Sequence, residues 1–184
     1  MSSSRSILVT IAQALLDALT PRTPRPRKEP GRSAARKTSS ADAGRSRGSQ
    51  TVRLDPARLH DILISYAPDR DGAPDAGEII WTWVPYEEGD GRGKDRPVLV
   101  IGRESADRVF AVRMTSRSHD GDHDYLSIGS GEWDSQGRES WVDVEQLYSV
   151  HDAGMRRETA VLSQPRFDRV AAALQKRYGW RVTR

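Results

Sequence analysis

Two apolar stretches with a glycine-rich charged loop between them stand out in the pattern of hydrophobic and polar positions. Residues 79–84 are all β-branched or aromatic, and residues 98–101 form a continuous run of valine, leucine and isoleucine. Such residues favour strands, and turn residues bound both segments. The loop alternates glycines with charged residues and then delivers an arginine and a proline to the second segment; these residues are Gly89, Gly91, Gly93, Arg96 and Pro97. The pattern predicts two strands, with an arginine at the edge of the second one beside a mobile loop.

Residues 108–115 alternate between two kinds of side chain. The apolar set is Phe110, Val112 and Met114, and the other set is Ala111, Arg113, Thr115 and, in phase, Arg117. Because successive side chains of a strand point to opposite faces, we expect one face to be core and the other to expose an Arg-Thr-Arg stripe to solvent. The same alternation favours Thr115 over Ser116 as the exposed hydroxyl.

Further short strands are expected at 125–128, 140–148 and 159–162, and a helix is expected at 165–178. The helix has Ser163 as a candidate cap, is stopped by Gly179 and carries an apolar stripe made of Phe167, Val170, Ala171 and Leu174. Five or so short strands with tight turns and a terminal helix predict a mainly β fold with α, a small antiparallel barrel with a C-terminal helix.

A second helix is expected at 52–66. Asp55 stands as a cap with Pro56 at the first helical position, and Leu59, Ile62 and Leu63 recur at helical spacing. A polar, turn-rich connector over 67–76 follows, so this helix is expected to pack outside the barrel.

The first 50 residues differ in composition from the rest. Residues 1–20 contain an apolar segment of good helix formers that is too short to span a bilayer, which predicts a short helix; a signal peptide is the alternative. Residues 21–50 are rich in proline, arginine, serine and glycine and are expected to form a disordered basic linker. The folded domain is therefore expected at 51–184.

Positive charge is concentrated in that N-terminal region. The first 50 residues hold ten Lys and Arg against three Asp and Glu, whereas the remaining 134 hold 19 against 23. The basic arm either attracts nucleic acid without regard to sequence or serves as a solvated linker. Any phosphate site in the domain must be local, since the domain itself is not basic. The chain has no cysteine, which excludes disulfides and thiolate metal sites and fits a reducing compartment.

Several short motifs occur in an order that resembles the MazF/PemK family of toxin ribonucleases from bacterial toxin–antitoxin pairs. They are Gly77-Glu78-Ile79-Ile80-Trp81, a loop with Gly89, Arg96-Pro97 before an apolar run, a strand ending in Thr115-Ser116, and Glu145-Gln146-Leu147 before a C-terminal helix. The resemblance covers a core of about 76–180. It implies an SH3-like barrel, a homodimer, a cytoplasmic location and no cofactor or metal.

The resemblance also implies an activity, which is metal-independent cleavage of single-stranded RNA at a short sequence by attack of the 2′-hydroxyl on the adjacent phosphorus. Arg96 and Thr115 match the catalytic positions of the family. Since an arginine side chain stays protonated, Arg96 is expected chiefly to stabilise charge on the phosphate, with protonation of the leaving group as a second role. The expected RNA-binding residues are Arg92, Lys94, Arg113, Ser116 and Arg117. The implied partners are single-stranded RNA, a cognate antitoxin and operator DNA bound together with the antitoxin, with no membrane.

Other interpretations of the same residues stay open. Arg96 without the motif is a solvated charge or a salt-bridge partner of Asp95 or Glu78. Trp81 and Trp83 have two interpretations, stacking on RNA bases and packing in the core, and core packing is preferred for Trp81. A catalytically silent nucleic-acid-binding or antitoxin-binding module on the same fold is the alternative function.

A metal-dependent nuclease is the third possibility, because His119, Asp122 and His123 lie in one polar run, although the spacing fits no tight metal motif. Departures from the family at Trp83, Gly91, Arg92 and Tyr148 bear on substrate sequence and on activity.

Overall fold

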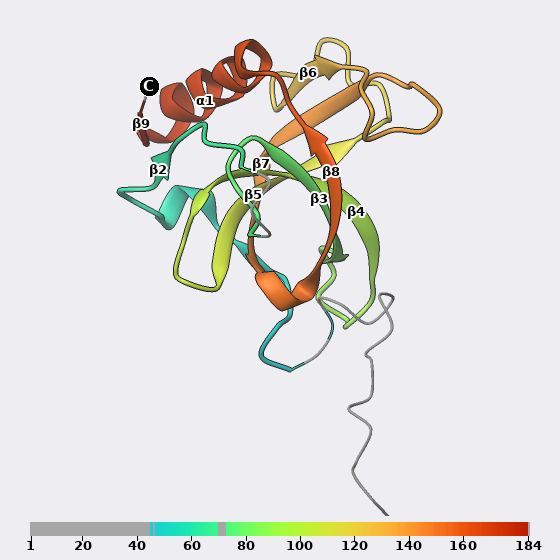
Figure 1. Ribbon diagram of the computed structural model, residues 1–184, viewed down its shortest axis with the longest axis vertical. Coiled ribbons are helices and arrows are strands. Elements are labelled where there is room, and N and C mark those ends of the chain that lie inside the picture. Colours follow the sequence, from blue (N-terminus) through green and yellow to red (C-terminus); the bar gives the residue numbers. More distant parts are fainter. Residues whose placement is uncertain (1–44, 46, 70–72, 184) are drawn as a thin grey trace, which may run out of the picture. The chain divides into compact units, whose positions relative to one another are not determined.

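Nine strands, two 3-10 turns and one α-helix make up the part of the chain that the structure describes, which is residues 45, 47–69 and 73–183 of a computed structural model (Figure 1). The elements are β1 (Val52–Leu54), η2 (Pro56–Arg58), β2 (Leu63–Ile64), β3 (Glu78–Pro85), β4 (Gly93–Arg103), β5 (Arg108–Thr115), β6 (Tyr125–Gly129), β7 (Ser140–His151), η3 (Asp152–Gly154), β8 (Met155–Val161), α1 (Gln164–Tyr178) and β9 (Arg181–Val182). The helix expected at 1–20 and nearly all of the expected linker at 21–50 lie outside the described residues.

One antiparallel sheet forms most of the domain. Its strand order is β1-β7-β5-β4-β3-β8, and β6 pairs with the first part of β7. The hydroxyl groups of Thr51 and Thr82 are 2.7 Å apart and buried. This contact ties the residue before β1 to β3 and brings distant parts of the strand order together. The sheet therefore curls on itself (Figure 1). The predicted fold class, mainly antiparallel β with one C-terminal helix, is confirmed.

Both faces of the curled sheet are buried over much of their length. Val112 and Met114 pack with α1 in one core cluster, as the alternation in β5 predicts. Val109 and Ala111 lie on the other face, but they are also fully buried, in a second cluster formed by strand residues. Of the expected stripe, Arg117 is exposed and Thr115 is half-buried, but the Arg113 side chain is only 18% exposed. The expectation of a solvent-facing stripe is therefore wrong at Arg113, because the curl of the sheet encloses that part of the face.

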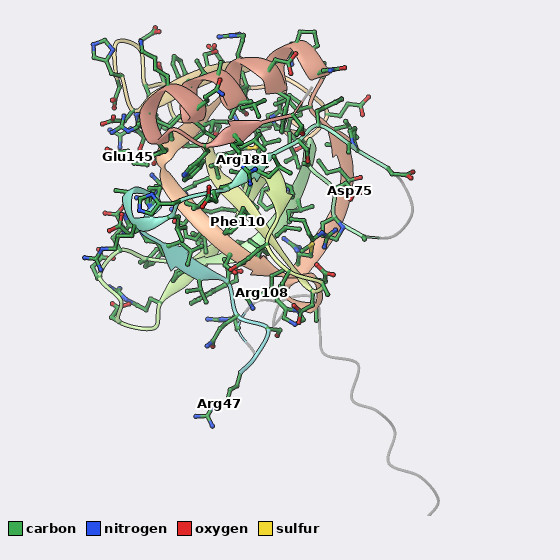
Figure 2. The ribbon with its side chains drawn as sticks, turned by 90° about the vertical axis from the view of Figure 1, so that its left-hand side faces the viewer. Arg47, Asp75, Arg108, Phe110, Glu145 and Arg181 are labelled. Carbon is green, nitrogen blue, oxygen red and sulfur yellow. The ribbon has the colours of Figure 1, made fainter. Side chains whose placement is uncertain are left out.

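Helix α1 follows its sequence pattern closely. The predicted stripe is buried, and Gly179 ends the helix with a left-handed φ of 75°, a conformation that glycine adopts without strain. Ser163 occupies the N-cap position, although its side chain makes no capping hydrogen bond. Arg177 in the last turn bonds to Glu145 of β7, which lies beside the helix in Figure 2. No helix in the described residues is long and apolar enough to cross a membrane.

The helix expected at 52–66 is wrong. Asp55 does cap a turn, since its carboxylate accepts from the Ala57 N–H, but that turn is the single 3-10 turn η2. The flanking backbone instead pairs with other strands: β1 lies antiparallel to β7, and β2 lies parallel to β9. Ile62 and Ile64 are buried at a spacing of two residues, so strand pairing and burial outweigh the local helix signal.

Candidate active site

A cleft of about 520 Å³ opens between β3, β4, the end of β5 and the loop that joins β6 to β7. The sheet supplies Trp81, Lys94, Asp95, Arg96, Pro97, Met114, Thr115 and Ser140, Ser116 follows β5 directly, and the loop supplies Glu132, Trp133, Asp134, Ser135 and Arg138. Four of the residues that the sequence analysis selects, Lys94, Arg96, Thr115 and Ser116, are therefore brought together in one depression.

The strand register explains why Arg96 and Thr115 meet. Val98 of β4 pairs with Arg113 of β5 in an antiparallel ladder. Arg96 precedes Val98 by two residues and Thr115 follows Arg113 by two, so an extension of this ladder places their side chains opposite each other on the same face. The catalytic pair expected from the resemblance thus occupies neighbouring positions at the cleft.

The Arg96 guanidinium makes no hydrogen bond or ion pair with any other residue that the structure describes. Asp95, its neighbour in sequence, points to β8 and pairs with Arg156 at 3.0 Å. The carboxylate of Glu78 accepts from the backbone N–H of Asp75 at 3.2 Å. Asp95 and Glu78 are the two carboxylates considered above as salt-bridge partners of Arg96, and both have other partners. The guanidinium is therefore available to an anion in the cleft.

The Thr115 hydroxyl is oriented by the backbone, because its oxygen accepts from the Arg117 N–H at 3.2 Å. The hydroxyl hydrogen remains available to donate toward the cleft. The Lys94 ammonium, like the Arg96 guanidinium, has no hydrogen bond or ion pair within the described part of the chain. The cleft thus combines two unpaired cations with the Thr115 hydroxyl, and further hydroxyls of its lining belong to Ser116 and Ser135. Such groups are suited to phosphate oxygens.

Three of the expected RNA-binding residues lie elsewhere. Arg92 pairs with Asp90 in the β3–β4 loop at 2.5 Å, and Arg117 is exposed outside the cleft lining. Arg113 donates to Asp143 at 2.5 Å, and the Asp143 side chain is only 4% exposed. Burial acts to lower the pKa of Arg113, but the Asp143 carboxylate together with Tyr148 and Tyr125 outweighs burial, and the pKa is raised. Arg113 is therefore part of a buried ion pair.

A second depression, of about 380 Å³, lies on the other side of Arg96 between the start of the β3–β4 loop and Arg113. Its wall includes Glu87, which accepts from Gln146 at 2.9 Å. Gln146 in turn accepts from the Tyr148 hydroxyl at 2.8 Å, and Tyr148 is 1% exposed. Burial raises the pKa of Tyr148. Tyr148, one of the departures from the family pattern, is thus a core residue. It belongs to a hydrogen-bond network that holds the start of the β3–β4 loop.

Sequence reasoning missed two walls of the cleft. Trp81 was expected in the core, but it is half-buried and lines the cleft, with the Arg156 guanidinium 5.9 Å from its ring centroid. The loop that joins β6 to β7 contributes Trp133, which is 7% exposed and donates its indole N–H to Ser140 at 2.9 Å. A large aromatic residue within a Gly/Ser/Asp segment was the available signal that the loop folds back onto the domain.

The polar run at 119–124 does not gather into a metal site. His119 stacks on Tyr125 with ring centroids 3.4 Å apart, and its Nδ1 lies 3.5 Å from Asp122. Asp124 pairs instead with Arg177 of α1 at 2.6 Å, and His123 is exposed. Among the described residues, no group of three or more His, Asp or Glu side chains is placed to hold a metal ion.

Solved structures similar to this chain include MazF proteins. MazE–MazF (form II) from Deinococcus radiodurans is 20% identical, with 58% of this chain and 96% of that chain covered and a TM-score of 0.45. An endoribonuclease in complex with its cognate antitoxin, from a mycobacterial species, is 15% identical, with coverages of 58% and 96% and a TM-score of 0.45. Toxin MazF-mt6 of Mycobacterium tuberculosis is 16% identical, with coverages of 56% and 97% and a TM-score of 0.41.

Curated protein sequences gave no match to this chain. The sequence model of the PemK-like, MazF-like toxins matches residues 75–177, more than half of the chain. That range runs from just before β3 to the last turn of α1 and includes every residue that lines the cleft. The chain belongs to the PemK-like, MazF-like toxin family of type II toxin–antitoxin systems.

Proposed function

We propose that this protein is the toxin of a type II toxin–antitoxin pair and cleaves single-stranded RNA at a short sequence without a metal ion. The observation that carries the proposal is the unpaired guanidinium of Arg96 in the same cleft as the Thr115 hydroxyl. The family supplies the reaction class, since its members are toxin endoribonucleases.

The proposed reaction is attack of the 2′-oxygen on the adjacent phosphorus, which releases a 5′-hydroxyl and leaves a 2′,3′-cyclic phosphate. Arg96 grips the non-bridging phosphate oxygens through its planar fork and stabilises the charge that develops there. Thr115 donates to the same phosphate and holds it in line with the attacking oxygen. Lys94 and Ser116 bind neighbouring backbone groups at the mouth of the cleft.

The proposed partners follow from the family. We infer a cognate antitoxin that covers the cleft and suppresses cleavage, a homodimer as the working form, operator DNA as a ligand of the complex with antitoxin, and a cytoplasmic location. Two of the similar structures are described as a MazE–MazF pair and as an endoribonuclease with its cognate antitoxin, which supports the antitoxin as a partner.

The test compares purified wild type with Arg96→Ala and Arg96→Lys on mixed-sequence single-stranded RNA in EDTA, with mapping of cut sites and of end chemistry. Arg58→Ala serves as the matched control, because Arg58 is exposed and pairs only with Asp55 within the described residues. We expect site-restricted cleavage with cyclic-phosphate ends in wild type and control, a loss of about 10²–10³-fold in Arg96→Ala, and partial activity in Arg96→Lys, which keeps the charge but not the fork.

Two results contradict this proposal. Folded wild type that binds RNA but never cuts it indicates the silent binding module. Cleavage that stops in EDTA indicates a metal-dependent nuclease.

A further inference from the structure

Attack by a 2′-hydroxyl needs a group that takes up the hydroxyl proton. The cations of the cleft are poor candidates, because arginine and lysine side chains carry donors and no acceptor in their protonated forms. The cleft contains no histidine among its lining residues. A proton acceptor inside it must therefore be one of three carboxylates, which belong to Asp95, Glu132 and Asp134.

Two of these carboxylates are already engaged. Asp95 of β4 pairs with Arg156 of β8, across the intervening strand β3. Asp134 accepts from Arg138 Nε at 2.9 Å and from the Gln136 N–H at 2.8 Å. These backbone and arginine contacts lower the pKa of Asp134, which makes it a weaker base. Glu132 alone of the three has no hydrogen bond or ion pair with another residue in the described ranges.

The backbone around Glu132 is fixed, although its carboxylate is exposed. Trp133 is buried and bonded to Ser140, at the start of β7. Gly131 lies against the Trp133 ring so closely that an added Cβ would come within 2.1 Å of it. The residue after Ser140, Trp141, pairs with Thr115. The β6–β7 loop, gold to orange in Figure 1, is thus anchored next to Thr115, with Glu132 at the cleft.

We propose that Glu132 is the general base of the RNA cleavage, an inference that rests on the proposed function. The carboxylate takes the proton of the 2′-hydroxyl while the 2′-oxygen bonds to phosphorus. The bond from phosphorus to the 5′-oxygen breaks, and its electron pair leaves with that oxygen, which takes a proton from water. Glu132 then returns its proton to solvent, so no other reactant is consumed.

The test is the pH dependence of cleavage at saturating protein, from roughly pH 6 to roughly pH 8.5, for wild type, Glu132→Gln and Glu139→Gln. Glu139 is the control, since it lies in the same loop but bonds to Ser127 and does not line the cleft. Other charged groups around Glu132 are Lys94, Asp95 and Arg96 from β4, Asp134 and Arg138 from its own loop, and Arg166 from α1. These remain unchanged in all three proteins.

Near neutral pH we expect Glu132→Gln to be slower by about 10²–10⁴-fold, with a defect that shrinks about tenfold per pH unit as hydroxide replaces the missing base. Affinity for an RNA with a 2′-deoxy residue at the cut site should stay within about threefold of wild type. A defect of constant size at every pH, or no defect, overturns the role of Glu132 while cleavage by wild type still stands. If wild type does not cleave, the proposed function fails, and the base assignment fails with it.

Discussion

Replacing Arg113 with methionine is expected to destabilise the domain, because Arg113 neutralises a buried carboxylate. The Asp143 side chain is 4% exposed and accepts from Arg113 at 2.5 Å and from the Glu145 N–H at 3.0 Å. Without Arg113 the charge keeps the backbone donor and the Tyr125 hydroxyl, but no cation among the described residues neutralises it. Breaking one partner of a buried pair costs about 3–5 kcal/mol, which is a large part of the roughly 5–15 kcal/mol that stabilises a typical domain.

The matched control is Arg92→Met. Arg92 and Asp90 are also 2.5 Å apart, but their side chains are 69% and 37% exposed. Such a surface pair contributes at most about 1 kcal/mol. In urea unfolding followed by tryptophan fluorescence at fixed protein concentration, with a slope of roughly 2 kcal/mol/M, Arg113→Met should lower the midpoint by about 1.5–2.5 M and Arg92→Met by at most about 0.5 M. Equal shifts for the two variants would refute the argument that burial sets the value of the pair.

The remaining predictions concern β2 and the cleft. Gly102→Ala should lower the free energy of unfolding by about 1–3 kcal/mol, measured by thermal unfolding, because the new Cβ would lie 2.4 Å from the backbone oxygen of Leu63. An unchanged free energy of unfolding would show that β2 does not pack against β4. Lys94→Gln should reduce the slope of log affinity against log salt by about 0.7 for a non-cleavable single-stranded RNA. Lys176→Gln, on the exposed side of α1, should leave that slope unchanged, and the contact is disproved if the two variants behave alike.

Much of the fold could be predicted because its signals are local. The β-branched runs of β3 and β4, the alternation of β5 and the apolar stripe of α1 each act within one element, and the structure contains all four. The segment at 52–66 departs from its local signals. Its cap and proline are real signals, but they produce only η2, because the flanking backbone groups bond to β7 and β9 and because Ile62 and Ile64 are buried.

The candidate site was predictable only in part. A family pattern led to Arg96 and Thr115, and the strand register brings them to one cleft. Trp81 was assigned to the core because it lies in a strongly apolar strand. Alternation shows which side chains share a face of a strand, but it does not show at which residue that face leaves the core and borders a cleft. Glu132 lacked any sequence signal, since its environment depends on a loop held by Trp133.

For β3, β4, β5 and α1 the sequence by itself determined which segments are strands and which is a helix, because side-chain shape and periodicity act over a few neighbouring residues. It also determined the family, through short motifs in a fixed order. Only the tertiary structure decided which charges are free. Arg113 forms an ion pair with Asp143. Arg96 is left unpaired because its neighbour Asp95 forms an ion pair with Arg156 of β8. Charge pairing joins residues that are distant in the chain, so it follows from strand register and loop packing rather than from local pattern.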